Sequence, residues 1–152
     1  MVVRPGRPND AEATAHIHVD SWAAAYTLTG PTLEERLEYH RRFPPTFVAD
    51  VDGEIVGFVA VGRSRDPDAE GELYTIYVDP THWGAGVGRE LIRAGEERMR
   101  ELGYQRVALW MLDGNSRAQR FYESAGWALD GERRTIEFVG QSMPEVRFAK
   151  QL

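Results

Sequence analysis

The chain has 152 residues, of which 42% are hydrophobic, and this is enough for one compact domain with a buried core. Its net charge of −6 argues against nucleic acid or an anionic membrane as a partner, because such surfaces are bound through basic faces. The chain has no cysteine, which excludes disulfides and thiolate metal sites, and no apolar run reaches the roughly 20 residues of a membrane span, so we expect a cytoplasmic protein.

Two helices are predicted in the first part of the chain. Asn9 is followed three residues later by Glu12, a spacing typical of a capping box at the start of a helix. This helix is expected to run to about Tyr26. Thr32 and Glu35 repeat the spacing and predict the start of a second helix.

The remaining elements are mostly strands. Asp52-Gly53 predicts a tight hairpin, because this dipeptide suits a turn that needs positive φ. A third helix is expected over residues 88–102, with Gly103 ending it, and a shorter fourth one over residues 115–125. Strands are expected at residues 2–4, 47–51, 55–61, 72–78, 106–112, 135–139 and 146–149, and loops at residues 29–31, 62–71 and 140–144.

The stretch from Tyr77 to Arg89 is the most informative part of the chain, because glycines at alternate positions join a strand to a helix. Gly84, Gly86 and Gly88 let successive backbone N–H groups point inward, and the helix adds the positive end of its dipole. The segment therefore predicts a site for a pyrophosphate. The dinucleotide fingerprint G-x-G-x-x-G fails, because Arg89 stands at its third glycine, and the Gly-Lys-Ser/Thr of a P-loop is absent. A glycine turn that merely begins a helix is the alternative.

This loop resembles the acetyl-CoA loop of the GNAT-type N-acetyltransferases, whose pattern is Arg or Gln, two residues, Gly, one residue, and Gly or Ala. Gly86 and Gly88 match the pattern, whereas Trp83 occupies the place of Arg or Gln, and we expect it to cover the loop by packing. The resemblance implies that N–H groups around residues 76–78 stabilise the oxyanion of acyl transfer. It also implies coenzyme contacts from Ile76, Tyr77, Val78, Trp83, Gly84, Ala85, Gly86, Val87, Gly88 and Arg89.

The order of the predicted elements resembles the GNAT fold over nearly the whole chain. The resemblance implies an α+β (α/β) architecture in a single domain, residues 1–152, with a mixed, strongly twisted seven-stranded sheet flanked by four helices. It further implies that the fourth and fifth strands splay apart, so that the pantetheine arm of coenzyme A takes over the freed backbone groups.

A second motif lies in residues 115–127 and is similar to the family's Asn, two residues, Ala, two residues, Phe-Tyr, then Gly-Phe. On this resemblance Tyr122 is the general acid, and a phenol of pKa about 10 suits a leaving thiolate of pKa about 8.5. A core aromatic is the alternative for Tyr122. Asn115 is expected to hydrogen-bond the pantetheine or the adjacent backbone and also to cap the helix. The further expected coenzyme contacts are Arg117, Ala118 and Phe121.

The acceptor amine must lose a proton before it attacks, which costs about 4 to 5 kcal/mol at pH 7 for an alkylamine. Glu72, at the start of the strand that leads into the glycine loop, resembles the family's glutamate base, and the alternative is a cap on an exposed strand end. His18, Trp22 and Tyr26 are spaced by four and form one stripe of the first helix. Trp22, Tyr26 and residues 27–31 resemble the acceptor-binding edge of the family, with a core stripe as the alternative.

These features predict transfer of an acetyl group from acetyl-CoA to a primary amine of a small molecule or peptide, by direct attack in a ternary complex, with coenzyme A as product. No cysteine and no serine elbow supplies a nucleophile for a covalent route. A catalytically weak acyl-CoA-binding sensor module is the alternative. The four histidines lack metal-ligand spacing, so we expect no metal. We expect no nucleic acid and no membrane as partner, and a homodimer is left open.

Overall fold

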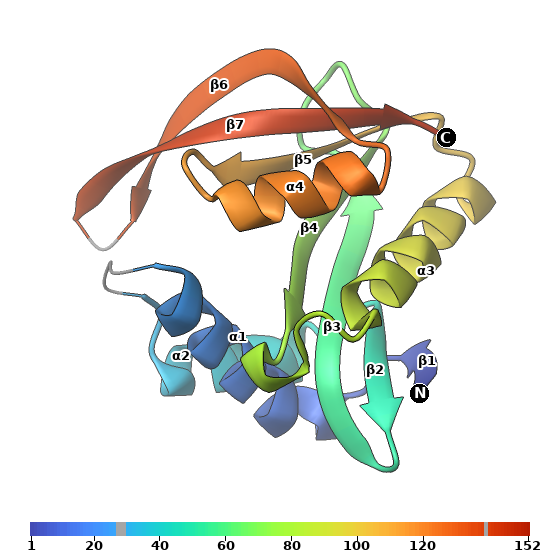
Figure 1. The fold of residues 1–152 in the computed structure, drawn as a ribbon, viewed down its shortest axis with the longest axis vertical. Helices are drawn as coiled ribbons and strands as arrows, with labels where there is room; N and C mark the ends of the chain where they lie inside the picture. Colours follow the sequence, from blue (N-terminus) through green and yellow to red (C-terminus); the bar gives the residue numbers. More distant parts are fainter. Residues whose placement is uncertain (27–29, 139) are drawn as a thin grey trace. The chain divides into compact units, whose positions relative to one another are not determined.

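The computed structural model describes residues 1–26, 30–138 and 140–152, and this part of the chain forms two compact units. Unit 1 comprises residues 1–61 and 75–98, and unit 2 comprises residues 62–74 and 99–152. Among the described helices, none combines the length and the apolar character needed to cross a membrane. The elements, labelled in Figure 1, are β1 (Val2–Pro5), η1 (Pro8–Asp10), α1 (Ala11–Ala25), α2 (Leu33–Arg42), β2 (Phe47–Val51), β3 (Glu54–Arg63), β4 (Gly71–Val78), η2 (Pro80–His82), α3 (Val87–Glu101), β5 (Arg106–Leu112), α4 (Ser116–Ser124), β6 (Ala128–Phe138) and β7 (Gln141–Gln151).

The strands form one mixed sheet in the order β1-β2-β3-β4-β5-β7-β6, which confirms the predicted seven-stranded architecture. β1, β2 and β3 pair antiparallel, as do β5, β7 and β6, whereas β4 and β5 pair parallel. The parallel ladder contains the pairs Gly71–Val107 and Glu72–Ala108. In the described part of β4 after Glu72 no residue pairs with β5, so the expected splay of the fourth and fifth strands is confirmed.

Unit 1 is organised around the β2–β3 hairpin and helix α3. Asp52 and Gly53 have φ of 52° and 87°, as the predicted tight turn requires. Helix α3 packs closely on β3: a Cβ added to Gly57 would lie 2.9 Å from the Leu91 side chain. The same Cβ would lie 3.0 Å from the Tyr77 carbonyl oxygen of β4, so close packing against both neighbours explains that glycine.

The start of the first helix differs from the sequence prediction. Asn9 is exposed, and the turn η1 precedes α1. The carboxylate of Asp10 accepts the backbone N–H of Arg7 at 2.8 Å and both terminal nitrogens of Arg4 at 2.9 Å. The predicted Asn9 capping box is therefore wrong, because a neighbouring strand supplies Asp10 with a cationic partner. At the second helix, Thr32 Oγ1 accepts the N–H of Glu35 at 3.2 Å, so that predicted cap is confirmed.

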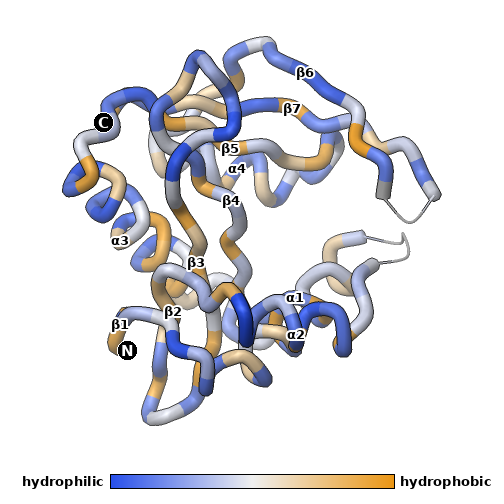
Figure 2. Tube along the Cα trace, turned by 180° about the vertical axis from the view of Figure 1, so that it is seen from behind, coloured by the Kyte–Doolittle hydropathy of each residue, from blue (hydrophilic) through white to orange (hydrophobic). Residues whose placement is uncertain are grey.

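Unit 2 packs helix α4 on β7. The ring centroids of Tyr122 and Phe148 are 5.7 Å apart, and Lys150 Nζ donates to the Ala125 carbonyl at 2.7 Å. Figure 2 shows β4 alternating between hydrophobic and more polar residues, whereas β6 at the sheet edge passes through mostly polar ones.

The expected loop at residues 140–144 is wrong, because β7 begins at Gln141 and contains Pro144. The Pro144 carbonyl accepts the Asp113 N–H at 2.9 Å. In an antiparallel strand the nitrogen of a residue faces the same edge as its carbonyl. The nitrogen of Pro144 therefore faces the side of β5, at a position beyond its last residue, Leu112. The absence of an N–H on Pro144 thus removes no hydrogen bond between β7 and β5. Val139, the predicted end of the sixth strand, lies outside the described residues.

Candidate functional site

The glycine loop of unit 1 begins where β4 ends. Asp79 caps η2, since its Oδ1 accepts the N–H of Thr81 at 3.0 Å and its hydroxyl at 2.9 Å. Gly84 and Gly86 have φ of +81° and +85°, a region that L-residues with a side chain rarely adopt. The Gly86 carbonyl accepts the N–H of Glu90 at 3.2 Å, so Gly86 is the residue that caps α3.

The loop is open and leads into the N-terminus of α3. Gly84 and Gly86 are exposed, and a Cβ at either would meet no atom within 4 Å. The first N–H groups of α3, at Val87, Gly88 and Arg89, cannot bond within the helix and add to the positive end of its dipole. This arrangement fits a polyanion such as a pyrophosphate. Gly88 is not among the described residues with positive φ. The backbone conformation of this loop therefore requires glycine at positions 84 and 86.

Trp83 differs from the expectation that it acts by packing. Its indole Nε1 donates to the Val78 carbonyl at 2.8 Å, and the side chain is half-buried. Ser21 of α1 donates its hydroxyl to the same carbonyl at 3.1 Å. Trp83 therefore makes a polar contact with the end of β4 in the place where Arg or Gln was expected.

The backbone of β4 narrows the choice of oxyanion donors. The Asp79 N–H donates to the Val56 carbonyl on β3 at 2.8 Å. Because successive residues of a strand alternate between its two edges, Tyr77 faces β3 as well, while the N–H groups of Ile76 and Val78 point to the opposite edge. Of the three predicted donors, Ile76 and Val78 are therefore the two on the edge away from β3.

The predicted stripe of α1 divides into a buried and a half-buried part. His18 is buried and stacks on Tyr77 with ring centroids 4.5 Å apart, so the Tyr77 side chain belongs to the core of unit 1. Trp22 and Tyr26 are half-buried, and their ring centroids are 4.6 Å apart. Residues 27–29 of the predicted acceptor loop lie outside the described residues.

His18 also meets His40 of α2, a residue that the sequence reasoning did not connect with it. Nδ1 of His18 lies 3.4 Å from Nε2 of His40, and both rings are buried. Burial, together with the Arg36 guanidinium, lowers the pKa of His18 to about 3 and that of His40 to about 4. Both rings are therefore neutral at pH 7.

The second motif is gathered on α4 of unit 2. Asn115 Oδ1 accepts the N–H of Ala118 at 3.1 Å, which confirms the predicted N-cap. Tyr122 is buried, with the rings of Phe121 and Phe148 at 5.5 and 5.7 Å from its own. Partial burial and the neighbouring Arg120 lower the pKa of the exposed Arg117, as expected for a cation beside a like charge.

Glu72 of unit 2 forms a close ion pair with Arg65. The Glu72 side chain is 1% exposed, so the alternative of an exposed strand end is wrong. Its Oε1 accepts the Arg65 backbone N–H at 3.1 Å, and its Oε2 accepts from the Arg65 guanidinium. Arg65 is itself 66% exposed. The sequence reasoning missed Arg65, because it lies in a loop and carries no motif.

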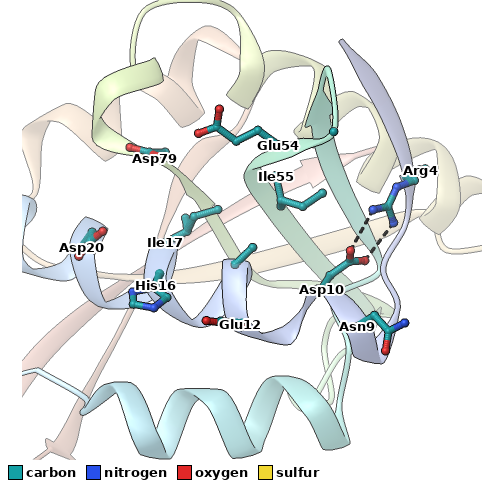
Figure 3. Close-up of a pocket in the computed structure, with 12 residues that line it drawn as sticks. Arg4, Asn9, Asp10, Glu12, His16, Ile17, Asp20, Glu54, Ile55 and Asp79 are labelled. Carbon is teal, nitrogen blue, oxygen red and sulfur yellow. Dashed lines mark hydrogen bonds and ion pairs between the residues drawn. The ribbon is translucent and has the colours of Figure 1, made fainter.

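A hollow of about 550 Å³ in unit 1 lies beside α1 and the β2–β3 hairpin (Figure 3). Glu12, His16 and Asp20 line it from α1, and Glu54 and Asp79 add further carboxylates. An acidic lining repels phosphate, so this hollow does not suit coenzyme A. The sequence analysis did not connect Glu12, His16 and Asp20, although their spacing of four along α1 is a visible signal.

The predicted site residues thus fall into two sets. Unit 1 holds residues 76–89 together with Trp22 and Tyr26, and unit 2 holds Glu72 together with Asn115, Arg117, Ala118, Phe121 and Tyr122. Within each unit, helix-capping hydrogen bonds and contacts between aromatic rings hold several of these residues in place.

Comparison with known proteins adds independent findings. A model of the acetyltransferase (GNAT) family matches residues 11–127. A mycothiol acetyltransferase of Thermobispora bispora is 34% identical over 137 residues, which are 83% of this chain and 46% of that protein. The N-acetyltransferase YuaI of Bacillus subtilis, described as uncharacterized, is 30% identical over 76% of this chain and 73% of its own length. A mycothiol acetyltransferase of Thermomonospora curvata is 36% identical over 64% of this chain, which spans 31% of that protein. The chain thus spans less than half of both mycothiol acetyltransferases.

Solved structures show the same fold. Ard1 from Thermoplasma volcanium has a TM-score of 0.77 and 25% identity, covering 99% of this chain and 97% of its own. The PaiA N-acetyltransferase from Thermoplasma acidophilum, solved in complex with coenzyme A, has a TM-score of 0.75 and 17% identity, covering 99% of this chain and 98% of its own.

Proposed function

The chain belongs to the acetyltransferase (GNAT) family, and we propose that it transfers an acetyl group from acetyl-CoA to a primary amine of a small molecule or peptide. The observation that carries the proposal is the glycine loop, in which positive φ at Gly84 and Gly86 leads directly into the N-terminus of α3. When bound, acetyl-CoA supplies an activated thioester. The relatives named mycothiol acetyltransferases favour a small-molecule acceptor.

Coenzyme binding is assigned to backbone N–H groups with a few arginines, because the protein as a whole is acidic. The N–H groups of Val87, Gly88 and Arg89 donate to the pyrophosphate, and the Arg89 guanidinium adds positive charge. On α4, Arg117 contributes a second cation. Burial and, to a smaller extent, the neighbouring Arg120 lower the Arg117 pKa, and a bound anion offsets the repulsion between the two cations.

The chemistry proceeds by direct attack in a ternary complex. The amine lone pair forms the C–N bond to the acetyl carbon, and the C–S bond breaks. Glu72 takes the proton that the amine loses, directly or through a water, and Tyr122 donates a proton to the departing sulfur. The N–H groups of Ile76 and Val78 donate to the acetyl oxygen as it gains negative charge, and the Trp22–Tyr26 pair contacts the acceptor.

The Arg65–Glu72 ion pair sets the condition under which Glu72 is a base. Both carboxylate oxygens accept from Arg65, so the amine proton must reach a remaining lone pair of this buried carboxylate, directly or through a water. Arg65 is 66% exposed, so its guanidinium can move into water, at the cost of leaving the buried Glu72 charge unpaired. An occupied carboxylate is also the observation that favours the alternative, an acyl-CoA-binding sensor module with weak catalysis.

The experiment combines coenzyme A calorimetry with an amine panel. Acetyl-CoA is mixed with each amine, and free thiol and acetylated product are measured together. Product formation with one amine class supports the transferase, whereas tight coenzyme binding without product across the panel supports the sensor module. If coenzyme A does not bind, both assignments are wrong.

A further inference from the structure

Two side chains of unit 1 converge on one backbone carbonyl at the end of β4. Ser21 Oγ and Trp83 Nε1 donate to the Val78 oxygen at 3.1 and 2.8 Å. Ser21 is 4% exposed, and Trp83 is half-buried. A carbonyl oxygen has two lone pairs, so both donors can be accepted at once.

The position of this carbonyl makes the contact consequential for the loop. Val78 is the last residue of β4, and Trp83 immediately precedes Gly84. The indole bond therefore closes the segment between them and holds the chain at the point where it enters the glycine pair. Gly84 and Gly86 have no side chains with which to hold the loop and lose much conformational freedom when it is ordered.

We propose that Ser21 and Trp83 form a clamp on the Val78 carbonyl that holds the glycine loop in its coenzyme-binding conformation. This inference rests on the proposed function. Trp83 acts through its N–H donor and not through the area of its ring, and both are positioning residues. The clamp also links α1, which carries the proposed acceptor contacts Trp22 and Tyr26, to the coenzyme loop.

Two substitutions at position 83 separate the donor from the ring. Trp83→Phe keeps an aromatic ring and removes the N–H, whereas Trp83→Arg removes the ring and keeps donors that reach a carbonyl. Coenzyme A affinity is measured by calorimetry for both. We expect about a fivefold loss in Trp83→Phe and less than about a twofold loss in Trp83→Arg, as for one neutral hydrogen bond.

Ser21→Ala tests the second donor. Alone it should cost about threefold in coenzyme A affinity, because Trp83 still satisfies the carbonyl. The Ser21→Ala/Trp83→Phe double variant should lose more than the product of the single losses, since a half-buried carbonyl then loses both donors. The matched control is Trp110→Phe in unit 2, which also removes an indole donor, to Asp66 Oδ2 at 2.8 Å, and should keep wild-type affinity.

Amide hydrogen exchange of residues 84–88 without ligand tests the clamp independently of coenzyme binding. We expect about fivefold faster exchange in Trp83→Phe and wild-type exchange in Trp83→Arg and in the Trp110→Phe control. Unchanged exchange and affinity in Trp83→Phe, or losses confined to Trp83→Arg, would overturn the clamp while leaving the transferase assignment intact. Failure of the wild-type protein to bind coenzyme A would instead refute the proposed function, and the exchange rates would still decide on the clamp.

Discussion

Acid should destabilise this fold through the two buried histidines of unit 1. His18 and His40 are 7% and 3% exposed, and burial with the nearby Arg36 lowers their pKa values to about 3 and about 4. The rings of Tyr77, Phe58 and Tyr39 pack against the two histidines, which also contact each other. We therefore consider a fall in pH from 7 to 5, a range in which both histidine rings of the native protein stay neutral.

The magnitude follows from proton linkage. In the unfolded chain a histidine has a pKa of about 6.5. The contribution to stability is complete above that pKa and is lost as the pH falls toward the native pKa, because the unfolded chain then binds protons that the native protein does not. Each histidine costs up to about 1.4 kcal/mol per pH unit, so the fall from pH 7 to 5 removes about 2 kcal/mol for each and about 4 kcal/mol for the pair.

Urea denaturation at pH 7, 6 and 5 measures this loss. The His18→Asn/His40→Gln variant keeps amide groups near the two bonded nitrogens but cannot titrate, so its free energy of unfolding should fall by about 4 kcal/mol less than that of the wild type. His16→Asn, at an exposed position of α1, is the matched control and should follow the wild type. Equal losses in the wild type and the double variant would refute the reasoning, because the buried rings would then titrate as they do in the unfolded chain.

The remaining predictions concern the proposed site. Gly86→Val should weaken coenzyme A binding by more than about tenfold in a folded protein, because valine does not tolerate φ of +85°, and calorimetry showing unchanged affinity would remove the cradle assignment. Tyr122→Phe should keep coenzyme affinity while turnover falls by roughly 10² to 10⁴, and normal turnover would withdraw its role as acid. Glu72→Gln should lower the rate most at low pH, where the amine is protonated, and partly recover as the pH rises. Arg65→Ala should retain far more activity than Glu72→Gln in the same rate assay if Glu72 is the base, whereas equal losses would indicate a purely structural ion pair.

Most turns and caps that depend on a few neighbouring residues were readable in the sequence, although the Asn9 capping box was not. The Asp52-Gly53 turn and the Thr32 and Asn115 caps appear as predicted, and α3 begins one residue before the predicted Gly88. Each rests on the φ preference of one residue or on a hydrogen bond within one helical turn, so the local pattern contains the information. The two family motifs are also short local patterns. Together with the order of the predicted helices and strands, they indicated the fold.

Partners across the fold were decided by the tertiary structure. Glu72 is a lone carboxylate in the sequence, and only β4 and the preceding loop bring Arg65 against it. His18 and His40 are 22 residues apart in sequence, a separation that carries no spacing signal. Trp83 looks like a departure from a motif until its indole meets the Val78 carbonyl. A side chain's own conformational preferences do not specify a partner that is distant in sequence. Strand register and helix packing decide which donor faces which acceptor, and both are set by burial of the whole core.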